Sequence, residues 1–445
     1  MRIIHSLRIE KIALHGYGIG FSDGKAVFVP YTMQGDIINA EIRHDKKNVC
    51  FGHVIDYVKT SAARVDTKCD AFGPKRACGG CDWLMAPYEM QLKWKSELIN
   101  ETFTTLKLGN KITAIVPSPQ PQCYRNKSFL PAGTSAQGLC FGIFERYSHK
   151  VVPHQKCLLQ PPVMDEIMQE IVAFAKQVKL EPYDEYNHSG ILRHVGIRIN
   201  SSQDEILLIL VTKGSKFPFT QQFIRTMATR FPQIIGIVQN INRSFGNVIL
   251  GNEDKLLWGS PYLNETLGDV HYRLHYRSFF QINAGTTEKL YAHLKAGLQA
   301  DDVVLDAFCG IGSIGLFVAG VVKQVIGIEE IAEAIADAEY NKTLNKCENI
   351  SFQLGKVEAE LPQLMNRHKF TTAILDPPRK GVEASVLLSL AEHKIKRIIY
   401  VSCNPMTLVR DIRLLIEQGY KVDEVTPYDM FPQTWHIETV VSLSL

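Results

Sequence analysis

The sequence predicts an α/β protein in which a small β-barrel and a central α+β domain precede a doubly wound parallel sheet. From about residue 276, apolar strands alternate with helical stretches, which is the pattern of a doubly wound sheet. Short alternating strands separated by turn signals fill residues 1–60, and this spacing is typical of a small barrel. We therefore divide the chain into domains 1–60, 61–275 and 276–445.

Composition and charge place the chain among ordinary globular proteins. Of its 445 residues, 45% are hydrophobic and 21% are charged, and the formal net charge is only +3. Residues 61–160 hold 13 lysines and arginines against 7 acidic residues, an excess larger than that of the whole chain. This segment predicts a modest basic patch for a phosphate partner, and a solvated surface without a partner explains the same charge equally well.

The sequence predicts a cytoplasmic protein without a membrane segment. No apolar run approaches the ~18 residues of a membrane span, and charges at Arg8, Glu10 and Lys11 interrupt the first apolar stretch. In the reducing cytosol, ten cysteines indicate metal binding or catalysis rather than disulfides. We expect a monomer.

The elements follow from apolar spacing. In the barrel, four runs alternate: IEKIALHG, KAVFVPY, DIINAEI and FGHVIDYV. Residues 87–107 have helical spacing, and this helix is expected to pack on the domain 276–445. The central domain predicts helices near 162–178 and 219–230, with strands at ILRHVGIRIN, EILLILVTKG, IIGIVQNIN and GNVILGN.

A glycine loop follows the first strand of the predicted parallel sheet. The segment VVLDAFCGIGSIGLFV leads from a strand through Gly310 and Gly312 into a helix, and Glu329 ends the next strand. Glycines let backbone approach a nucleotide closely, and a carboxylate at Glu329 can bind ribose hydroxyls. The spacing also fits an NAD site, but Asp306 at the strand end favours S-adenosylmethionine. A glycine turn without a ligand is the remaining alternative.

Two further strands end in reactive side chains. TTAILDPPRKG delivers Asp376 to the carboxyl edge of the sheet, followed by Arg379, which suits a phosphate backbone. IIYVSC places Cys403 at the same edge. A lone cysteine is often inert packing, but this position favours a nucleophile.

A thiolate beside a methyl donor indicates chemistry on a pyrimidine. Its addition to C6 of uracil makes C5 nucleophilic enough to accept a methyl group, and a base must then remove the C5 proton. Glu438 and His436, in the segment MFPQTWHIET, are the two candidates for this base. Strand alternation would place both on one face, so the residues alone leave the choice open.

The motifs CGIGSIG, LDPPRKG, YVSCNP and MFPQTWHIET, in this order, resemble those of the RNA uracil-5-methyltransferases. The resemblance covers nearly the whole chain. It implies a Rossmann-like catalytic domain and an N-terminal TRAM domain, the OB-like RNA-binding module of the 23S rRNA subgroup.

The resemblance also implies roles for individual residues. Cys403 would be the nucleophile and Glu438 the base. Gln281 would contact the methyl donor or the target base, with the ring of Phe279 nearby and Arg379 on the substrate side. The implied methyl-donor contacts are Gln281, Asp306, Phe308, Gly310, Gly312, Glu329 and Asp376.

Four cysteines predict a metal site. Cys69, Cys78 and Cys81 lie in CDAFGPKRACGGC, and Cys157 follows in HQKC, a set that suits an iron–sulfur cluster or zinc. The resemblance implies a [4Fe–4S] cluster, although the family places five residues between the first two cysteines and this chain has eight. We expect the cluster to hold together a loop-rich RNA-binding region. Among the alternatives for these four cysteines, a zinc site ranks second and free thiols rank last.

The leading hypothesis is therefore formation of 5-methyluridine in 23S rRNA. The same reaction on tRNA is the nearest alternative. An NAD-dependent oxidoreductase that uses the same glycine loop is a second enzyme hypothesis, and a non-catalytic RNA-binding protein is the hypothesis from another functional class.

Overall fold

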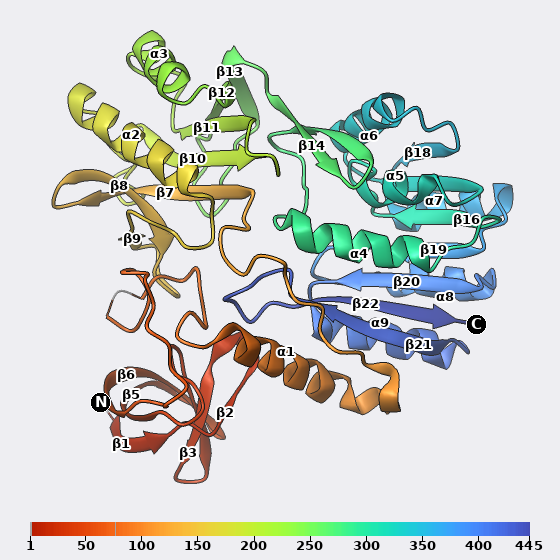
Figure 1. Cartoon of the computed structure of the whole chain (residues 1–445), viewed down its shortest axis with the longest axis horizontal. Helices are drawn as coiled ribbons and strands as arrows, with labels where there is room; N and C mark the ends of the chain where they lie inside the picture. The colour runs from red at the N-terminus through yellow and green to blue at the C-terminus, as the bar shows by residue number, and fades with distance from the viewer. Residues whose placement is uncertain (1, 76) are drawn as a thin grey trace.

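The computed structural model describes residues 2–75 and 77–445, and its first part is a six-stranded sheet (Figure 1). Its strands are β1 (Arg2–Arg8), β2 (Lys11–Ile12), β3 (Gly18–Ser22), β4 (Lys25–Val29), β5 (Ile37–Asp45) and β6 (Val49–Lys59). They are arranged in the order β1-β5-β6-β4-β3-β2. Along β5, side chains alternate between buried and half-buried, as a strand with one face on a core requires. The sequence patterns missed β1, and IEKIALHG forms only the short β2.

A long connection then leads to helix α1 (Tyr88–Phe103) and two short 3₁₀ turns, η2 (Thr104–Leu106) and η3 (Gly109–Lys111). The predicted helix 87–107 is therefore shorter at its C-terminus, because Lys107 adopts a left-handed conformation with φ 53°. Trp94, Leu98 and Ile99 on α1 are buried in the same core as Leu408 and Ile412 of the C-terminal region. In Figure 1, α1 lies along α9 (Pro405–Glu417), far from α1 in the sequence.

The central part is a seven-stranded sheet in the order β13-β12-β11-β10-β7-β8-β9. Its strands are β7 (Lys127–Ser135), β8 (Gly138–Phe144), β9 (Val151–Pro153), β10 (Leu192–Ile199), β11 (Ile206–Thr212), β12 (Ile234–Ile241) and β13 (Glu253–Gly259). Helices α2 (Pro162–Val178) and α3 (Thr220–Arg230) match the predicted positions, and both pack on this sheet in one apolar core.

One strand prediction in this region is wrong. The segment GNVILGN forms a loop, and the strand that pairs with β12 is the following segment, β13. Val248 is 63% exposed, and its carbonyl accepts a hydrogen bond from the Asn242 side chain at 2.6 Å. The apolar residues of this loop therefore do not pack in a core. The strand β13 was not predicted because it begins with the polar residues Glu253, Asp254 and Lys255.

The C-terminal part consists of a β-hairpin, a seven-stranded sheet and six helices. The hairpin is β14 (Tyr262–Leu267) and β15 (Val270–His275). The sheet strands are β16 (Val303–Ala307), β17 (Gln324–Glu329), β18 (Ile350–Leu354), β19 (Thr372–Leu375), β20 (Arg397–Ser402), β21 (Lys421–Tyr428) and β22 (Glu438–Ser444). The helices are α4 (Ala284–Ala296), α5 (Ser313–Ala319), α6 (Ala332–Leu344), α7 (Val357–Arg367), α8 (Ala384–Glu392) and α9.

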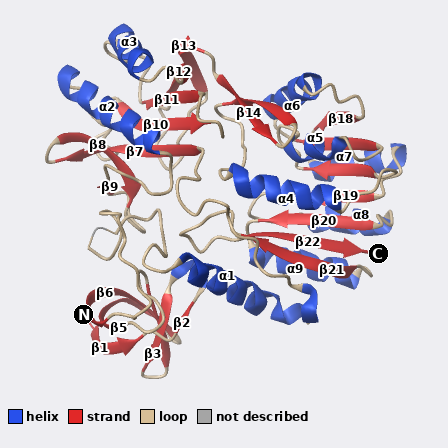
Figure 2. Cartoon of the chain, viewed as in Figure 1, coloured by secondary structure: helices blue, strands red, loops and turns tan. Residues whose placement is uncertain are grey.

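This sheet has the order β18-β17-β16-β19-β20-β22-β21, and only β22 runs opposite to the others. Helices α4 and α9 lie on its two sides in separate apolar cores (Figure 2). The predicted doubly wound α/β fold is thus confirmed. In the described part of the chain, no helix combines the length and the apolar character that crossing a membrane requires.

The topology determines what meets at one sheet edge. The carboxyl ends of β16, β17, β19 and β20 lie together because these strands are parallel. Since β22 is reversed, its first residue, Glu438, reaches the same edge. The final ladder pair between β20 and β22 is Ser402 with Thr439, so the next two residues to face each other are Cys403 and Glu438.

Candidate active site

A cavity of about 1650 Å³ opens at this edge of the C-terminal sheet. Segments after five parallel strands, residues between 252 and 281, and the start of β22 form its walls. Ten predicted site residues line it: Phe279, Gln281, Asp306, Phe308, Gly310, Glu329, Asp376, Arg379, Cys403 and Glu438. The sequence did not single out the neighbouring Tyr291 and Phe431, which also line the cavity. Both were missed because aromatic residues at helix or loop positions carry no local signal of a site.

The glycine loop has the backbone that its sequence predicts. Gly310 and Gly312 have φ values of 54° and 75°, in the region that glycine adopts at little cost. Phe308 shares this conformation, with φ 65°, which is uncommon for a bulky residue and often found at ligand sites. Gly312, a predicted donor contact, is absent from the cavity lining and lies against Phe352, whose ring a Cβ would meet at 2.7 Å.

Two carboxylates shape the loop. The Gly310 N–H donates to Glu329 Oε2 at 3.1 Å, so the end of β17 holds the loop after β16. Asp306 is only 1% exposed, and its Oδ2 accepts a hydrogen bond from the Gly315 N–H at 2.9 Å. Its Oδ1 is buried without a partner. Burial raises the pKa of Asp306 to about 7.

These residues fit S-adenosylmethionine. S-adenosylmethionine is a polar nucleoside with an amino acid tail. Its binding requires an unpaired carboxylate oxygen, a second carboxylate at the loop and a backbone with little side-chain bulk, and all three are present. Asp376, at the end of β19, adds a third carboxyl group to the same cavity. Burial raises the pKa of Asp376 to about 7.

The thiol of Cys403 lies at a junction between a strand and a helix. Asn404 is the N-cap of α9, and its Oδ1 accepts a hydrogen bond from the Met406 N–H at 3.2 Å. Its Nδ2 donates to the carbonyl of Arg379 at 3.0 Å. Asn404 therefore ties the loop of the thiol to the loop that follows Asp376, and Pro405 starts the helix as a first-turn residue.

Burial is the largest influence on the pKa values of Cys403 and Glu438. Burial raises the pKa of the Cys403 thiol to about 11, Glu438 and Asp376 add to this effect, and Arg379 opposes it. Glu438 is only 2% exposed, and burial, then Asp376, raises its pKa well above the ordinary value. A carboxylate with a raised pKa is a stronger base, which suits proton removal from carbon.

The pKa of Cys403 predicts slow labelling at neutral pH. With a pKa of about 11, roughly one thiol in 10⁴ is ionised at pH 7, and this fraction rises about tenfold with each pH unit. We expect alkylation of Cys403 by iodoacetamide, measured by peptide mass spectrometry, to increase about tenfold per unit between pH 7 and pH 9. Cys123, which is exposed, is the reference within the chain. Faster labelling of Cys403 than of Cys123 at pH 7 would contradict the raised pKa of the Cys403 thiol.

Strand alternation predicted that His436 and Glu438 lie on the same face of a strand, and this prediction is wrong. The strand begins only at Glu438, so His436 belongs to the preceding loop and lines a different cavity. Burial, then Arg379, lowers the pKa of His436 to about 4. The sequence could not separate the two candidates, because the boundary of β22 depends on its pairing with β20.

The loop that carries Phe279 and Gln281 is held by the central domain. Phe279 is 72% exposed, whereas Gln281 is buried. The Asn126 side chain donates to the Gln281 carbonyl at 2.9 Å, and Arg198 donates to the Ser278 carbonyl at 2.8 Å. Arg198 was missed from the sequence because it lies within an apolar strand, yet it is fully buried.

The four predicted metal ligands gather in one region. Cys69, Cys81 and Cys157 pack in one apolar cluster, and Cys69 and Cys78 pack in the adjoining one. Across residues 2–75 and 77–445, however, no group of three or more His, Cys, Asp or Glu side chains is arranged to hold a metal ion. The predicted metal ligation is therefore not confirmed.

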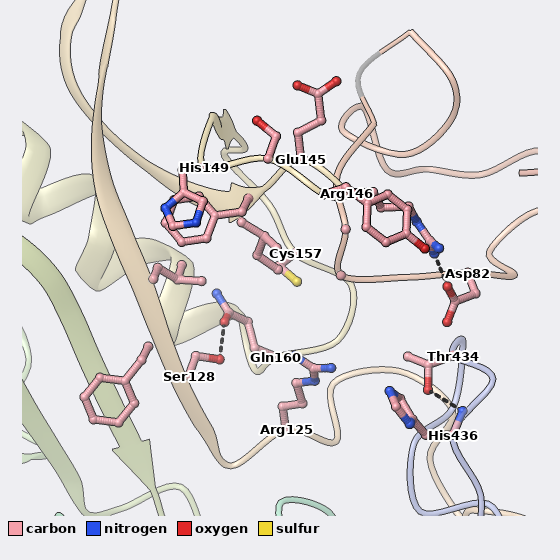
Figure 3. A pocket seen from close by; sticks show the side chains of 18 of the residues that line it. Asp82, Arg125, Ser128, Glu145, Arg146, His149, Cys157, Gln160, Thr434 and His436 are labelled. Carbon is pink, nitrogen blue, oxygen red and sulfur yellow. Dashed lines mark hydrogen bonds and ion pairs between the residues drawn. The ribbon is translucent and has the colours of Figure 1, made fainter. Parts of the chain in front are cut away.

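A second cavity, of about 730 Å³, lies beside these cysteines (Figure 3). Its walls come from the central domain, the segment after Cys78 and the loop before Glu438. Arg125, Arg146, His149 and His436 surround it in Figure 3, with Cys157 at its wall. Nε of Arg125 is buried without a hydrogen-bond partner. Asp82 and Glu145 also line this cavity, and Asp82 forms an ion pair with Arg146, so the basic patch predicted for residues 61–160 stays a prediction.

Comparison with known proteins agrees with this geometry. The profile of the family described as tRNA (Uracil-5-)-methyltransferase matches residues 232–445. A protein of Halalkalibacterium halodurans named uncharacterized RNA methyltransferase is 36% identical over 98% of this chain and 96% of its own length. A protein with the same description from Clostridium acetobutylicum is 38% identical, again over 98% of this chain and 96% of its own.

One solved structure covers the whole fold. The Pyrococcus abyssi tRNA (uracil-54, C5)-methyltransferase in complex with S-adenosyl-L-homocysteine superimposes with a TM-score of 0.79 at 26% identity, over 99% of this chain and 100% of that chain. These matches exclude the oxidoreductase and the non-catalytic readings. The chain belongs to the family of S-adenosylmethionine-dependent RNA (uracil-5-)-methyltransferases.

Proposed function

We propose that the protein methylates C5 of a uridine in 23S rRNA, with Cys403 as nucleophile and Glu438 as base. One observation carries the proposal. The register of β20 and β22 sets Cys403 opposite Glu438, in the cavity that also contains the glycine loop and Asp376. Nucleophile, base and methyl-donor residues therefore border one space, as a reaction between a base and a bound methyl donor requires.

The proposed steps balance around the sulfur atom. S-adenosylmethionine, when bound, supplies an electrophilic methyl group. The Cys403 thiolate forms a bond to C6 of uracil, which moves an electron pair to C5. After C5 has accepted the methyl group, the Glu438 carboxylate removes the C5 proton, the bond between sulfur and C6 breaks, and the thiolate is restored. Arg379 stabilises the thiolate, since it favours the charged form of Cys403.

The predicted binding residues keep their roles in this proposal. Glu329 binds the ribose hydroxyls of the methyl donor, and Asp306 uses its free Oδ1 for a polar donor group. Phe308, Gly310, Gln281 and Asp376 complete the donor site, and Gly312, outside the cavity lining, supports the loop through its backbone bonds to Cys309 and Leu316. Phe279, exposed at the cavity, contacts the target base, which must leave its stack to enter.

The N-terminal half supports an RNA substrate. We propose that residues 1–60 form an RNA-binding barrel, that 61–275 bind RNA and that 276–445 catalyse. The cavity of Figure 3 offers Arg125, whose Nε has no partner, to a phosphate backbone, whereas Arg146 and His149 are paired with Asp82 and Glu185. tRNA is the second candidate substrate, because the Pyrococcus abyssi enzyme, which matches 99% of this chain, is a tRNA methyltransferase.

Mapping of 5-methyluridine in cells that lack the protein tests the substrate. We expect one or more sites in 23S rRNA to lose the methyl group and all tRNA sites to keep it. Return of the modification with the wild-type gene, and not with a Cys403→Ala gene, is the control. Loss confined to tRNA would select the second candidate, and full retention in both RNAs would contradict the proposal.

We propose further that Cys69, Cys78, Cys81 and Cys157 bind a [4Fe–4S] cluster. Their approach in two adjoining apolar clusters supports this. In a single-zinc site with Zn–S bonds of about 2.3 Å, the sulfur atoms must lie within about 4 Å of each other. A cluster binds each thiolate at a separate iron atom, so it allows a wider spacing.

Purification without oxygen tests the cluster. We expect a brown protein with broad visible absorbance and about four iron atoms per chain. A Cys81→Ala variant should lose the iron, whereas Cys123→Ala, at an exposed cysteine outside the set, should retain it. A colourless protein with stoichiometric zinc would contradict the cluster.

A further inference from the structure

The loop of residues 429–437 connects β21 to β22 and ends immediately before Glu438. We call it the β21–β22 loop. It contributes Phe431 to the active-site cavity, and Thr434 and His436 to the cavity of Figure 3. The loop therefore separates the two cavities. Its conformation is set by residues that lie more than 300 positions earlier in the chain.

Lys95 of α1 binds both ends of this loop. Its side chain is fully buried, and its Nζ donates to Asp429 Oδ1 at 2.5 Å and to the His436 carbonyl at 2.7 Å. A third hydrogen bond goes to the Phe431 carbonyl at 3.1 Å. One ammonium group thus uses its three protons to hold the first, third and penultimate residues of the loop.

Asp429 is equally buried and has a second donor. Its Oδ2 accepts a hydrogen bond from the Tyr88 hydroxyl at 2.7 Å, also from α1. A charge pair removed from water needs this degree of hydrogen bonding to be tolerated. Tyr88 and Lys95 lie seven residues apart, two turns of helix, so one face of α1 presents both groups to the loop.

Gln433, at the tip of the loop, is held separately. Its N–H donates to Gln91 Oε1 at 3.1 Å, and the Gln91 side chain donates back to Gln433 Oε1 at 2.8 Å. Gln433 has φ 69°, a conformation that is uncommon for a residue with a side chain and that persists when its surroundings enforce it. The Asp82 N–H donates to the Gln433 carbonyl at 2.8 Å and adds to this enforcement.

We propose that Lys95 is a positioning residue for Glu438, acting through the β21–β22 loop. This inference rests on the proposed function of Glu438. Because the His436 carbonyl is two residues from Glu438, its bond to Lys95 determines how the chain enters β22. Cys403 depends on different contacts, those of Asn404 with α9 and with the Arg379 carbonyl. Loss of the Lys95 contact should therefore disturb the base and leave the nucleophile in place.

The test separates formation of the covalent intermediate from its resolution. The double variant Lys95→Met and Asp429→Asn removes both buried charges at similar volume, so neither charge is left unpaired. With full-length protein, S-adenosylmethionine and substrate RNA, we expect adduct formation within about threefold of wild type. A displaced base should slow product release from the adduct by about 10²-fold. A protein–RNA adduct that survives denaturing gel electrophoresis should therefore accumulate.

The matched control is Lys93→Met, the same substitution on the exposed face of α1, which should show no adduct. Tyr88→Phe is the second variant, because it keeps the charge pair and removes one donor from Asp429. Tyr88→Phe should slow release of product from the covalent adduct several-fold. If the double variant does not fold, this variant alone tests the positioning role. Equal slowing of both steps, or an unchanged ratio of adduct to product in the folded variants, would overturn the proposal.

Glu438→Gln and Cys403→Ala, assayed in parallel, distinguish this failure from failure of the proposed function. If Glu438→Gln accumulates adduct and the Lys95 and Tyr88 variants do not, only the positioning role is wrong. If wild-type turnover persists in Cys403→Ala, the proposed mechanism itself is wrong, and Lys95 has no base to position.

Discussion

Replacement of Cys403 by alanine is expected to reduce methyl transfer by about 10⁴-fold or more, because the covalent step then has no nucleophile. The side chain lies at the surface of the cavity, and the backbone of its loop is held by Asn404 rather than by the thiol. Binding of S-adenosylmethionine, measured by calorimetry, should stay within about twofold of wild type, since the donor residues belong to other strands. Release of methylated RNA is the activity measurement.

Cys347→Ala is the matched control for this substitution. Cys347 lies in the same domain, is half-buried and is absent from the cavity lining, so this variant should retain activity. Turnover of Cys403→Ala close to that of wild type would remove Cys403 as the nucleophile. Loss of donor binding together with activity would show instead that the substitution disturbs the whole edge of the sheet.

Glu438→Gln is expected to stop the reaction one step later. The amide has nearly the same shape as the carboxyl group but accepts no proton, so the methylated adduct keeps its C5 proton and its bond to Cys403. General-base removal typically costs about 10²–10⁴ in rate. We expect a protein–RNA band on denaturing gels, with the transferred methyl group in the trapped species and a mass that matches one RNA per chain.

His436→Gln introduces the same side chain two positions earlier and distinguishes the two candidate bases. His436 lines the cavity of Figure 3, and its pKa is lowered to about 4, so it offers little basicity to the active site. This variant should accumulate no adduct. Adduct in His436→Gln and free turnover in Glu438→Gln would reverse the assignment of the base.

The sequence predicts the site well where an apolar strand ends at a carboxylate or a cysteine. Asp306, Asp376 and Cys403 each follow an apolar run, and parallel strands bring such ends to one edge whatever the rest of the chain does. The glycine loop is also local, because its left-handed backbone depends on glycine at fixed positions.

Contacts between distant segments could not be predicted in this way. Lys95 occurs in the sequence as one of several charged residues on an amphipathic helix, and its buried partner, Asp429, follows 334 residues later. Arg198 is an equivalent case within the central sheet, where an arginine in an apolar strand supports the loop of Phe279. Such pairings carry no periodic signal, because each partner has an ordinary local environment in the sequence.

The reversed strand β22 has a consequence for how the protein folds. Successive strands usually pair as neighbours, but β21 cannot take the position beside β20, which β22 fills. β21 therefore reaches its place either by leaving a gap one strand wide for β22 or as half of a β21–β22 hairpin that docks on β20. The thiol and the carboxylate therefore face each other only once β22 has paired with β20, so assembly of the reactive pair requires this part of the sheet to be complete.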